Sequence, residues 1–138
     1  MDGMTERHVV VIVDDDPQVL AALRRALGRS VCEILTTDRP ETAIRWVETR
    51  DVSLVISDQR MPELTGTALL EEVRRRSPST VRLLLTAYPG PTAGEPGLRQ
   101  HVDGLFSKPW DVPMLRRAVR EFLRDREGGQ LEEGALDQ

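Results

Sequence analysis

The sequence predicts an α/β fold in which helices pack on both faces of a doubly wound, five-stranded parallel sheet. Short apolar segments alternate with amphipathic segments along the chain, and the connections between them are too short to hold other elements. This alternation is typical of parallel strands joined by right-handed crossovers. The length of 138 residues corresponds to one folding unit. We therefore expect a single domain of this class.

The first strand and the first helix have the clearest signals. Residues 9–13 are all β-branched, which predicts a strand buried on both faces. In residues 17–28, apolar side chains recur at helical spacing. Asp16 followed by Pro17 is typical of an N-cap and a first helical residue, and Gly28 is a natural helix stop.

The next three elements are shorter. Residues 33–36 and residues 54–57 predict strands, the second of them more apolar than the first. Between them, Asp38 is expected to cap a helix that runs through Val47. The reason is that Glu41 follows Asp38 at the spacing of a capping box.

The second half of the chain continues the alternation. Residues 67–76 predict a helix and residues 81–85 a strand. Residues 104–107 predict a weaker strand, and residues 112–124 predict the last helix from their apolar stripe.

One stretch interrupts the pattern between the strand at 81–85 and the strand at 104–107. A proline inside a helix costs about 3 kcal/mol and a glycine about 1 kcal/mol relative to alanine. We therefore expect irregular backbone over residues 89–96 and at most a short helix over residues 97–102, which makes the fourth helix irregular or shortened. The residues responsible are Pro89, Gly90, Pro91, Gly94, Pro96 and Gly97.

Composition and charge narrow the class of protein. Residues 1–6 are expected to be a flexible N-terminus, residues 7–125 the folded domain, and residues 126–138 a flexible tail or a linker remnant. A net charge of −4 argues against direct nucleic-acid binding. The apolar runs are too short for a signal peptide or a membrane span, and the single Cys32 allows no internal disulfide. A cytoplasmic protein is expected.

Polar residues with complementary chemistry follow the predicted strands. Asp14 and Asp15 come after the first strand, and Asp58 comes after the third. Thr86 and Lys108 follow the fourth and the fifth. Ligands of such sheets bind beyond the carboxyl ends of the strands, so these side chains are expected to converge there. Carboxylate oxygens without histidine or cysteine favour Mg²⁺.

Over roughly residues 7–124 the sequence resembles the receiver domain of two-component response regulators. The motifs are Val13-Asp14-Asp15, the run from Ser57 to Pro62 with Gly66, Leu85-Thr86-Ala87, and Lys108-Pro109. The resemblance implies a flavodoxin-like receiver fold. The wording Asp58-Gln59-Arg60-Met61-Pro62 with Lys108-Pro109-Trp110 is further similar to receivers that precede HD-GYP domains or hydrogenase-type transcription activators.

The resemblance implies a role for each of these residues. Asp58 is the phosphoacceptor that attacks the phosphorus of a phosphohistidine. Asp58 also belongs to the implied Mg²⁺ site, in which Asp15 is a direct ligand, Asp14 acts mainly through bound water, and Arg60 contributes its main-chain carbonyl. Lys108 pairs with Asp58 and then holds a phosphoryl oxygen. The hydroxyl of Thr86 binds another phosphoryl oxygen.

The resemblance also implies partners. We expect a phosphorelay signalling protein, not an enzyme, which receives its phosphoryl group from a sensor histidine kinase or a phosphotransfer protein. Phosphorylation is expected to change its binding to a downstream effector domain or protein, with the chain a monomer or a weak dimer. Many receivers carry an aromatic residue three positions before the lysine. Leu105 stands there, so the usual aromatic relay is expected to be absent.

Two other classes compete with this interpretation. Haloacid dehalogenase-type phosphatases also use an aspartate after the first strand, which Asp14-Asp15-Asp16 imitates. That class, however, leaves Asp58 unexplained, and Gln18 stands where a Thr or Val is expected. A binding module that is never phosphorylated is the third class, and its mark is the absence of a response to beryllofluoride with Mg²⁺.

Overall fold

The structure, a computed structural model, describes residues 8–28 and 32–136. These residues form a five-stranded, fully parallel sheet with the strand order β2-β1-β3-β4-β5. The predicted α/β class is confirmed. The elements are β1 (His8–Val13), α1 (Pro17–Leu27), β2 (Cys32–Thr37), α2 (Pro40–Thr49), β3 (Leu54–Asp58), α3 (Gly66–Arg76), β4 (Val81–Thr86), α4 (Pro89–Ala93), α5 (Leu98–His101), β5 (Gly104–Ser107) and α6 (Val112–Leu136).

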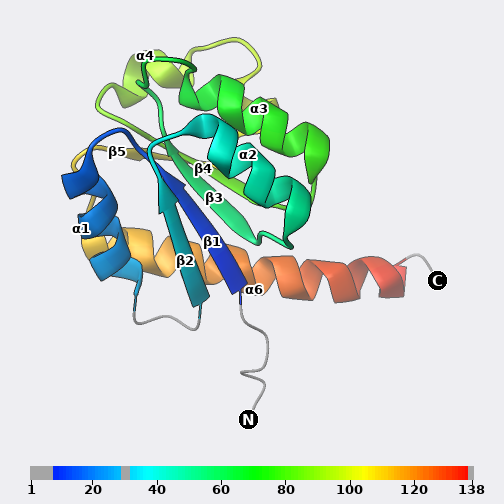
Figure 1. Cartoon of the computed structure of the whole chain (residues 1–138). Helices are drawn as coiled ribbons and strands as arrows, with labels where there is room; N and C mark the ends of the chain where they lie inside the picture. Colours follow the sequence, from blue (N-terminus) through cyan, green and yellow to red (C-terminus); the bar gives the residue numbers. More distant parts are fainter. Residues whose placement is uncertain (1–7, 29–31, 137–138) are drawn as a thin grey trace.

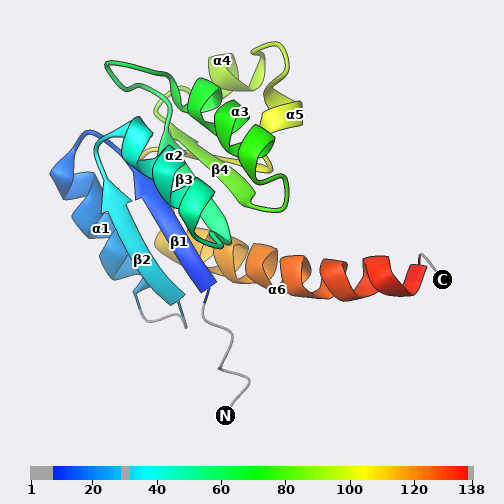
Figure 2. The same ribbon diagram turned by 45° about the vertical axis from the view of Figure 1, so that its right-hand side comes forward.

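Helices cover both faces of the sheet (Figures 1 and 2). Alternate residues of β1 point to opposite sides, so Val10 and Ile12 join a core with α1 and α6, while Val9 and Val11 join a core with α2 and α3. Because both faces are buried, β1 is apolar throughout and does not alternate with polar residues. Each buried side chain of this size contributes roughly 1.5–3 kcal/mol to folding.

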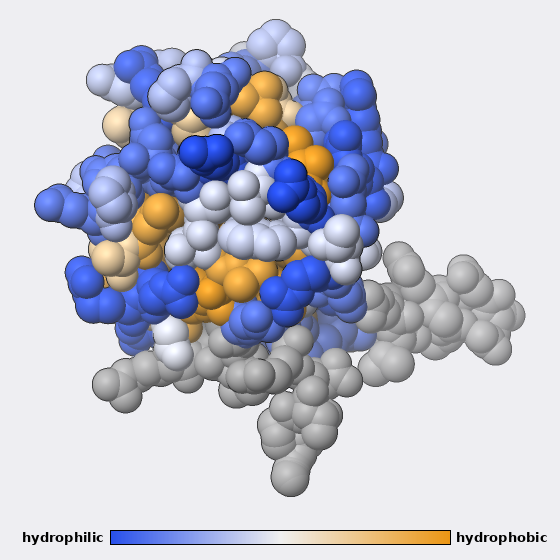
Figure 3. All heavy atoms as spheres, viewed as in Figure 1, coloured by the Kyte–Doolittle hydropathy of each residue, from blue (hydrophilic) through white to orange (hydrophobic). Residues whose placement is uncertain are grey.

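The surface is mainly hydrophilic. On the face drawn in Figure 3, hydrophobic residues show as small areas between hydrophilic ones. Within the described residues, no helix is both long and apolar enough to cross a membrane.

The helix starts agree with the sequence at α1 and differ at α2. The Asp16 side chain caps α1 by accepting the Gln18 N–H at 2.9 Å, as predicted. At α2 the N-cap is Arg39, without a side-chain hydrogen bond, so the capping box expected from Asp38 does not form. Pro40 takes the first helical position, where its missing N–H costs no intrahelical hydrogen bond, and it is buried.

The expectation of irregular backbone over residues 89–96 is wrong in part, because α4 forms at its start. Pro89 and Pro91 occupy the first and third helical positions, where backbone N–H groups have no intrahelical acceptor. The prolines therefore cost no hydrogen bond. Gly97 ends this stretch with a φ of 77°, which favours glycine, and the short α5 follows within the predicted range.

The last helix is longer than predicted. The sequence favours an end near Arg124 and a flexible tail beyond it, whereas α6 continues to Leu136. Contacts with the body of the domain hold the helix beyond the expected end. Arg126 Nε donates to the carbonyl of Ser79 at 3.1 Å, and Glu127 Oε2 lies 2.5 Å from His8 Nε2.

Candidate functional site

The predicted site residues lie at one edge of the sheet. Asp14 and Asp15 follow β1, Asp58 ends β3, Thr86 ends β4, and Lys108 follows β5. Because all strands are parallel, their carboxyl ends meet at the same edge, which is where ligands bind in this architecture. The fold thus brings together side chains that are up to 94 positions apart in sequence.

Lys108 links two of the carboxylates. Its Nζ donates to Asp14 Oδ2 at 2.9 Å and to Asp58 Oδ1 at 3.1 Å. The Asp14 side chain is 1% exposed and that of Asp58 is 8% exposed, so both charges depend on the lysine for compensation. Lys108 is the only lysine in the sequence, and its compact ammonium suits a position between two carboxylates.

The electrostatic balance of the site favours a divalent cation. Carboxylate oxygens of Asp14, Asp15 and Asp58 all lie within 4.8 Å of one another. Burial raises the pKa of Asp14, although the Asp16 N–H and Lys108 act in the opposite direction. Burial also acts to lower the pKa of Lys108, but its hydrogen bonds to Asp14 and Asp58 outweigh this, and the net pKa is raised. One ammonium among three carboxylates leaves excess negative charge, which suits Mg²⁺.

The loop after β3 is held by backbone hydrogen bonds. The Gln59 N–H donates to the Leu85 carbonyl at 2.9 Å, and the Gly66 N–H donates to the Gln59 carbonyl at 2.9 Å. Asp58 therefore sits on a backbone fixed both to β4 and to the start of α3, which preorganises its carboxylate.

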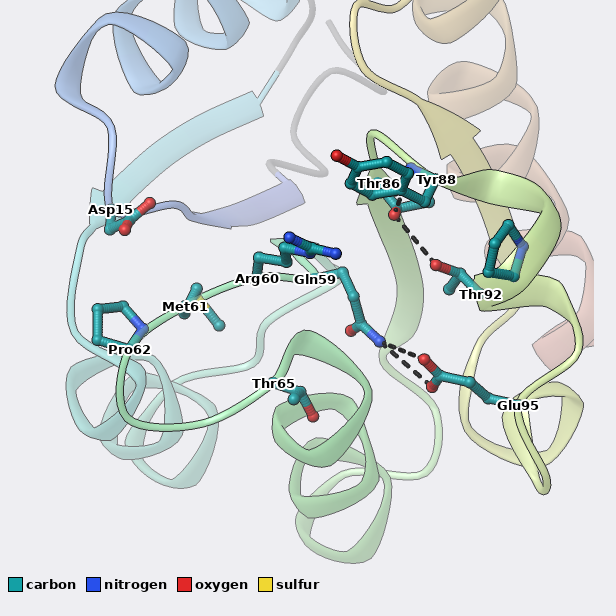
Figure 4. A pocket seen from close by; sticks show the side chains of 11 residues that line it. Asp15, Gln59, Arg60, Met61, Pro62, Thr65, Thr86, Tyr88, Thr92 and Glu95 are labelled. Carbon is teal, nitrogen blue, oxygen red and sulfur yellow. Dashed lines mark hydrogen bonds between the residues drawn. The ribbon is translucent and has the colours of Figure 1, made fainter.

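A cavity of about 660 Å³ opens beside this loop, between the loop and α4 (Figure 4). The guanidinium of Arg60 lies 4.5 Å from the centroid of the Tyr88 ring at its mouth. Such a cation–π contact is worth about 0.5–1 kcal/mol at an exposed site. Arg60 and Tyr88 are both exposed and both line this cavity, and the pair is called the cover here.

We predict that this cover slows the loss of a phosphoryl group from Asp58. Replacing both residues in an Arg60→Ala, Tyr88→Ala variant is expected to speed hydrolysis by about tenfold, because water then reaches the site freely. The decay of the phosphorylated mass over time measures this. Equal lifetimes of the two proteins would contradict the role of the cover.

The structure adds residues that the sequence did not single out. Thr92 lies 3.1 Å from Thr86 through their hydroxyl oxygens, and Glu95 accepts hydrogen bonds from Gln59. For Gln59, the only indication in the sequence is its position beside Asp58 in the motif. No sequence pattern indicates a role for Thr92 or Glu95, because both lie in residues 89–96, where irregular backbone was expected. Leu105 packs on the α3 side and Phe106 on the α6 side, so Phe106 does not take the place of an aromatic at 105.

The order of the strands is that of flavodoxin-like α/β proteins, and the acidic edge with its lysine agrees with the receiver class that the motifs predict. A family model described as the response regulator receiver domain matches residues 10–120. The chain belongs to this family, as its motifs predict. Receiver domains of this family are in general signalling domains that interact with histidine kinases and effector domains, and they bind Mg²⁺ at an acidic pocket.

Curated relatives are transcriptional regulators. The chain is 34% identical over 123 residues to the hydrogenase transcriptional regulatory protein HoxA of Cupriavidus necator, covering 86% of this chain and 24% of that protein. It is 25% identical over 131 residues to the DNA-binding transcriptional regulator NtrC of Salmonella typhimurium, covering 92% of this chain and 28% of that protein. The chain therefore spans about a quarter of the length of these relatives.

Solved structures agree with the assignment. The receiver domain of an HD domain-containing protein from Pseudomonas fluorescens superposes with a TM-score of 0.78 at 27% identity, covering 89% of this chain and 99% of that one. A CheY-like receiver domain from Methanospirillum hungatei has a TM-score of 0.82 at 22% identity over 90% of this chain and 99% of that one, which shows the fold. The HoxA match agrees with the predicted similarity to receivers of hydrogenase-type transcription activators.

Proposed function

We propose that the chain accepts a phosphoryl group on Asp58 from a sensor histidine kinase or a phosphotransfer protein, and that this changes its binding to a downstream effector. The observation that carries the proposal is the position of Asp58. Its buried carboxylate lies at the carboxyl edge of the sheet within hydrogen-bond distance of the one lysine of the chain.

The chemistry assigned to Asp58 is a phosphoryl transfer. A carboxylate oxygen of Asp58 attacks the phosphorus of a phosphohistidine, a P–O bond forms as the P–N bond breaks, and the imidazole leaves and is protonated. Lys108 already lies 3.1 Å from Asp58 Oδ1, so its ammonium is placed to bind a phosphoryl oxygen. Thr86, at the end of the neighbouring strand, supplies a hydroxyl for another oxygen.

The residues at the site fit Mg²⁺. We assign Asp15 and Asp58 as direct ligands, Asp14 as a group that acts mainly through bound water, and the Arg60 main-chain carbonyl as a further ligand. Bound Mg²⁺ neutralises charge on the transferring phosphoryl group. The three carboxylates that cluster within 4.8 Å support this assignment.

The same observations bear on the two alternative classes of protein. Membership of the receiver family removes the basis for a haloacid dehalogenase-type phosphatase. A receiver that has lost phosphorylation is the remaining alternative. The intact set of Asp14, Asp58 and Lys108 with its short contacts favours a working site over it.

The experiment is labelling with acetyl phosphate and measurement of the intact mass. With Mg²⁺ we expect one added phosphoryl group per chain, and without Mg²⁺ or in an Asp58→Asn variant we expect none. An exposed-site control, Asp51→Asn, is expected to label like the wild type. A phosphoryl group that persists in Asp58→Asn would place the acceptor elsewhere, and no labelling of the wild type would identify a module that is not phosphorylated.

The partners follow from the proposed reaction. HoxA and NtrC are transcriptional regulators of which a receiver is about a quarter, so we propose that the effector is a domain or protein downstream of this receiver. Cytoplasmic localisation and a monomeric or weakly dimeric state stay predictions.

A further inference from the structure

The core-facing side of α6 changes from apolar to charged near its end. Leu115, Val119 and Leu123 lie on this side and are buried in the core. Arg126 and Glu127 stand three and four residues after Leu123, so they continue the same face of the helix. This is where α6 passes the amino-terminal edge of the sheet, opposite the phosphoacceptor site (Figures 1 and 2).

Glu127 contacts the first residue of β1. Its Oε2 lies 2.5 Å from His8 Nε2, and His8 Nδ1 lies 3.0 Å from the Ser53 hydroxyl. Because an ionised carboxylate only accepts hydrogen bonds, His8 Nε2 carries a proton and donates it to Glu127. Ser53 is buried, its N–H donates to the Val9 carbonyl at 2.8 Å, and its carbonyl accepts the Val81 N–H at 2.9 Å. The imidazole therefore rests on backbone that is fixed to both β1 and β4.

Arg126 makes a second attachment at the same edge. Its Nε donates to the Ser79 carbonyl at 3.1 Å, and its Nη2 donates to Asp51 Oδ1 at 3.2 Å. The Arg126 side chain is 11% exposed and that of Asp51 is 89% exposed, so the ion pair contributes little and the Ser79 carbonyl is the main anchor. Thr80 fixes this turn, because its buried hydroxyl donates to the Val52 carbonyl at 2.7 Å.

The last turns of α6 have little stability of their own. Gly128 and Gly129 follow Glu127 directly, and glycine is a poor helix former. The helix nevertheless continues to Leu136, and among the described elements none lies beside its last turns (Figures 1 and 2). A short helical segment without a packed face is marginal in water. Its order therefore depends on the turn before it, where Arg126 and Glu127 are attached.

The length of β1 separates these attachments from the phosphoacceptor site. His8 begins β1, and Asp14 follows the last residue of that strand. Six residues at about 3.3 Å each correspond to about 20 Å. Residues 9–13 between them are all buried, and close-packed cores resist small displacements. A local rearrangement around Asp58 is therefore not expected to reach the end of α6.

We propose that Arg126 and Glu127 form a clamp that makes the end of α6 a rigid arm, and that the clamp stays closed when Asp58 is phosphorylated. The clamp consists of the contacts of Glu127 with His8 and of Arg126 with Ser79. The arm holds any effector domain joined to its end in one direction, so the orientation of that domain does not carry the signal. The inference goes beyond the proposed function, and only its statement about phosphorylation rests on that function.

Hydrogen exchange of the full chain, resolved by residue with NMR, tests the clamp. The probes are the amides of residues 125–131, and the variants are Arg126→Ala and Glu127→Ala. Alanine is a better helix former than arginine or glutamate, so a purely local effect would raise the protection of these amides. Loss of the clamp is expected instead to lower their protection about tenfold. Protection that is unchanged or higher in both variants would overturn the clamp. The matched control is Glu121→Ala on the exposed side of α6, which is expected to cause no loss.

A variant of His8 tests whether its contact with Glu127 is direct. His8→Phe keeps a ring at the start of β1 without hydrogen-bonding groups, so it is expected to lower protection about as much as Glu127→Ala. The double variant is expected to add little, because both changes break one contact. Effects that multiply in the double variant would contradict the direct contact. The amides of Val10 and Ile12 are expected to keep their protection, and an equal loss there would show a global effect instead of a local arm.

Beryllofluoride with Mg²⁺ tests the independence from phosphorylation. In the wild type, protection over residues 125–131 is expected to be the same with and without it. All variants are also labelled with acetyl phosphate and are expected to match the wild type, because the clamp lies far from Asp58. If the wild type takes up no phosphoryl group, the proposed function is wrong, while the comparison of variants still decides the clamp. If the wild type is labelled but beryllofluoride lowers this protection, the arm is part of the response and the inference is wrong.

Discussion

A Gly66→Ala variant is expected to lose about 3 kcal/mol of unfolding free energy, at the upper end of the usual cost of overpacking. A Cβ at this position would lie 2.3 Å from the Asp58 carbonyl oxygen and 2.6 Å from Leu84 Cδ1. The first neighbour is backbone held in β3, so it cannot move away cheaply. Urea unfolding measures the loss.

Gly90 offers the matched control. It lies in α4, and beyond its chain neighbours and its own helix backbone no atom lies within 4 Å of an added Cβ, so Gly90→Ala is expected to leave stability unchanged or raise it by about 0.5 kcal/mol. Equal stabilities of Gly66→Ala and Gly90→Ala would contradict the steric argument. Because the clash is with Asp58 itself, Gly66→Ala is also expected to slow labelling of that residue.

A Lys108→Met variant is expected to lose about 3 kcal/mol at pH 7.5 without Mg²⁺, because breaking a buried ion pair leaves its partners uncompensated. Here the partners are Asp14, at 1% exposure, and Asp58, at 8%. Lys108→Arg keeps the charge and is expected to lose less. Arg25→Met, on the exposed side of α1, is expected to change stability by less than about 0.5 kcal/mol.

The pH dependence of Lys108→Met has a definite sign. Burial raises the pKa of Asp14 in the folded chain, and without the lysine that pKa rises further. Folding then favours the protonated carboxyl, so the contribution of Asp14 to stability is greatest at low pH and falls as the pH rises through the raised pKa. Unfolding curves from pH 4.5 to pH 7.5 should therefore show the deficit shrinking toward low pH. A deficit that grows toward low pH would contradict this account.

The α/β class, the strands and the approximate bounds of most helices were predictable from the sequence, which carries them in patterns between near neighbours. These depend on local periodicity, as in the β-branched residues 9–13, and on short-range capping, as at Asp16. The sequence also predicted that Asp14, Asp58 and Lys108 meet at one edge, because parallel strands place their carboxyl ends together. Each of these inferences needs only neighbours in sequence and one rule of topology.

Other features depend on partners that are distant in the chain, so they become visible only in the folded protein. Beyond Arg124, α6 is held by contacts with distant residues. Glu127 contacts His8. Arg126 donates to the Ser79 carbonyl and to the Asp51 carboxylate. The contacts of Thr92 and Glu95 form because α4 folds next to Thr86 and Gln59. His8 and Glu127 are 119 positions apart and Gln59 and Glu95 are 36 apart, so local sequence patterns carry no record of these contacts.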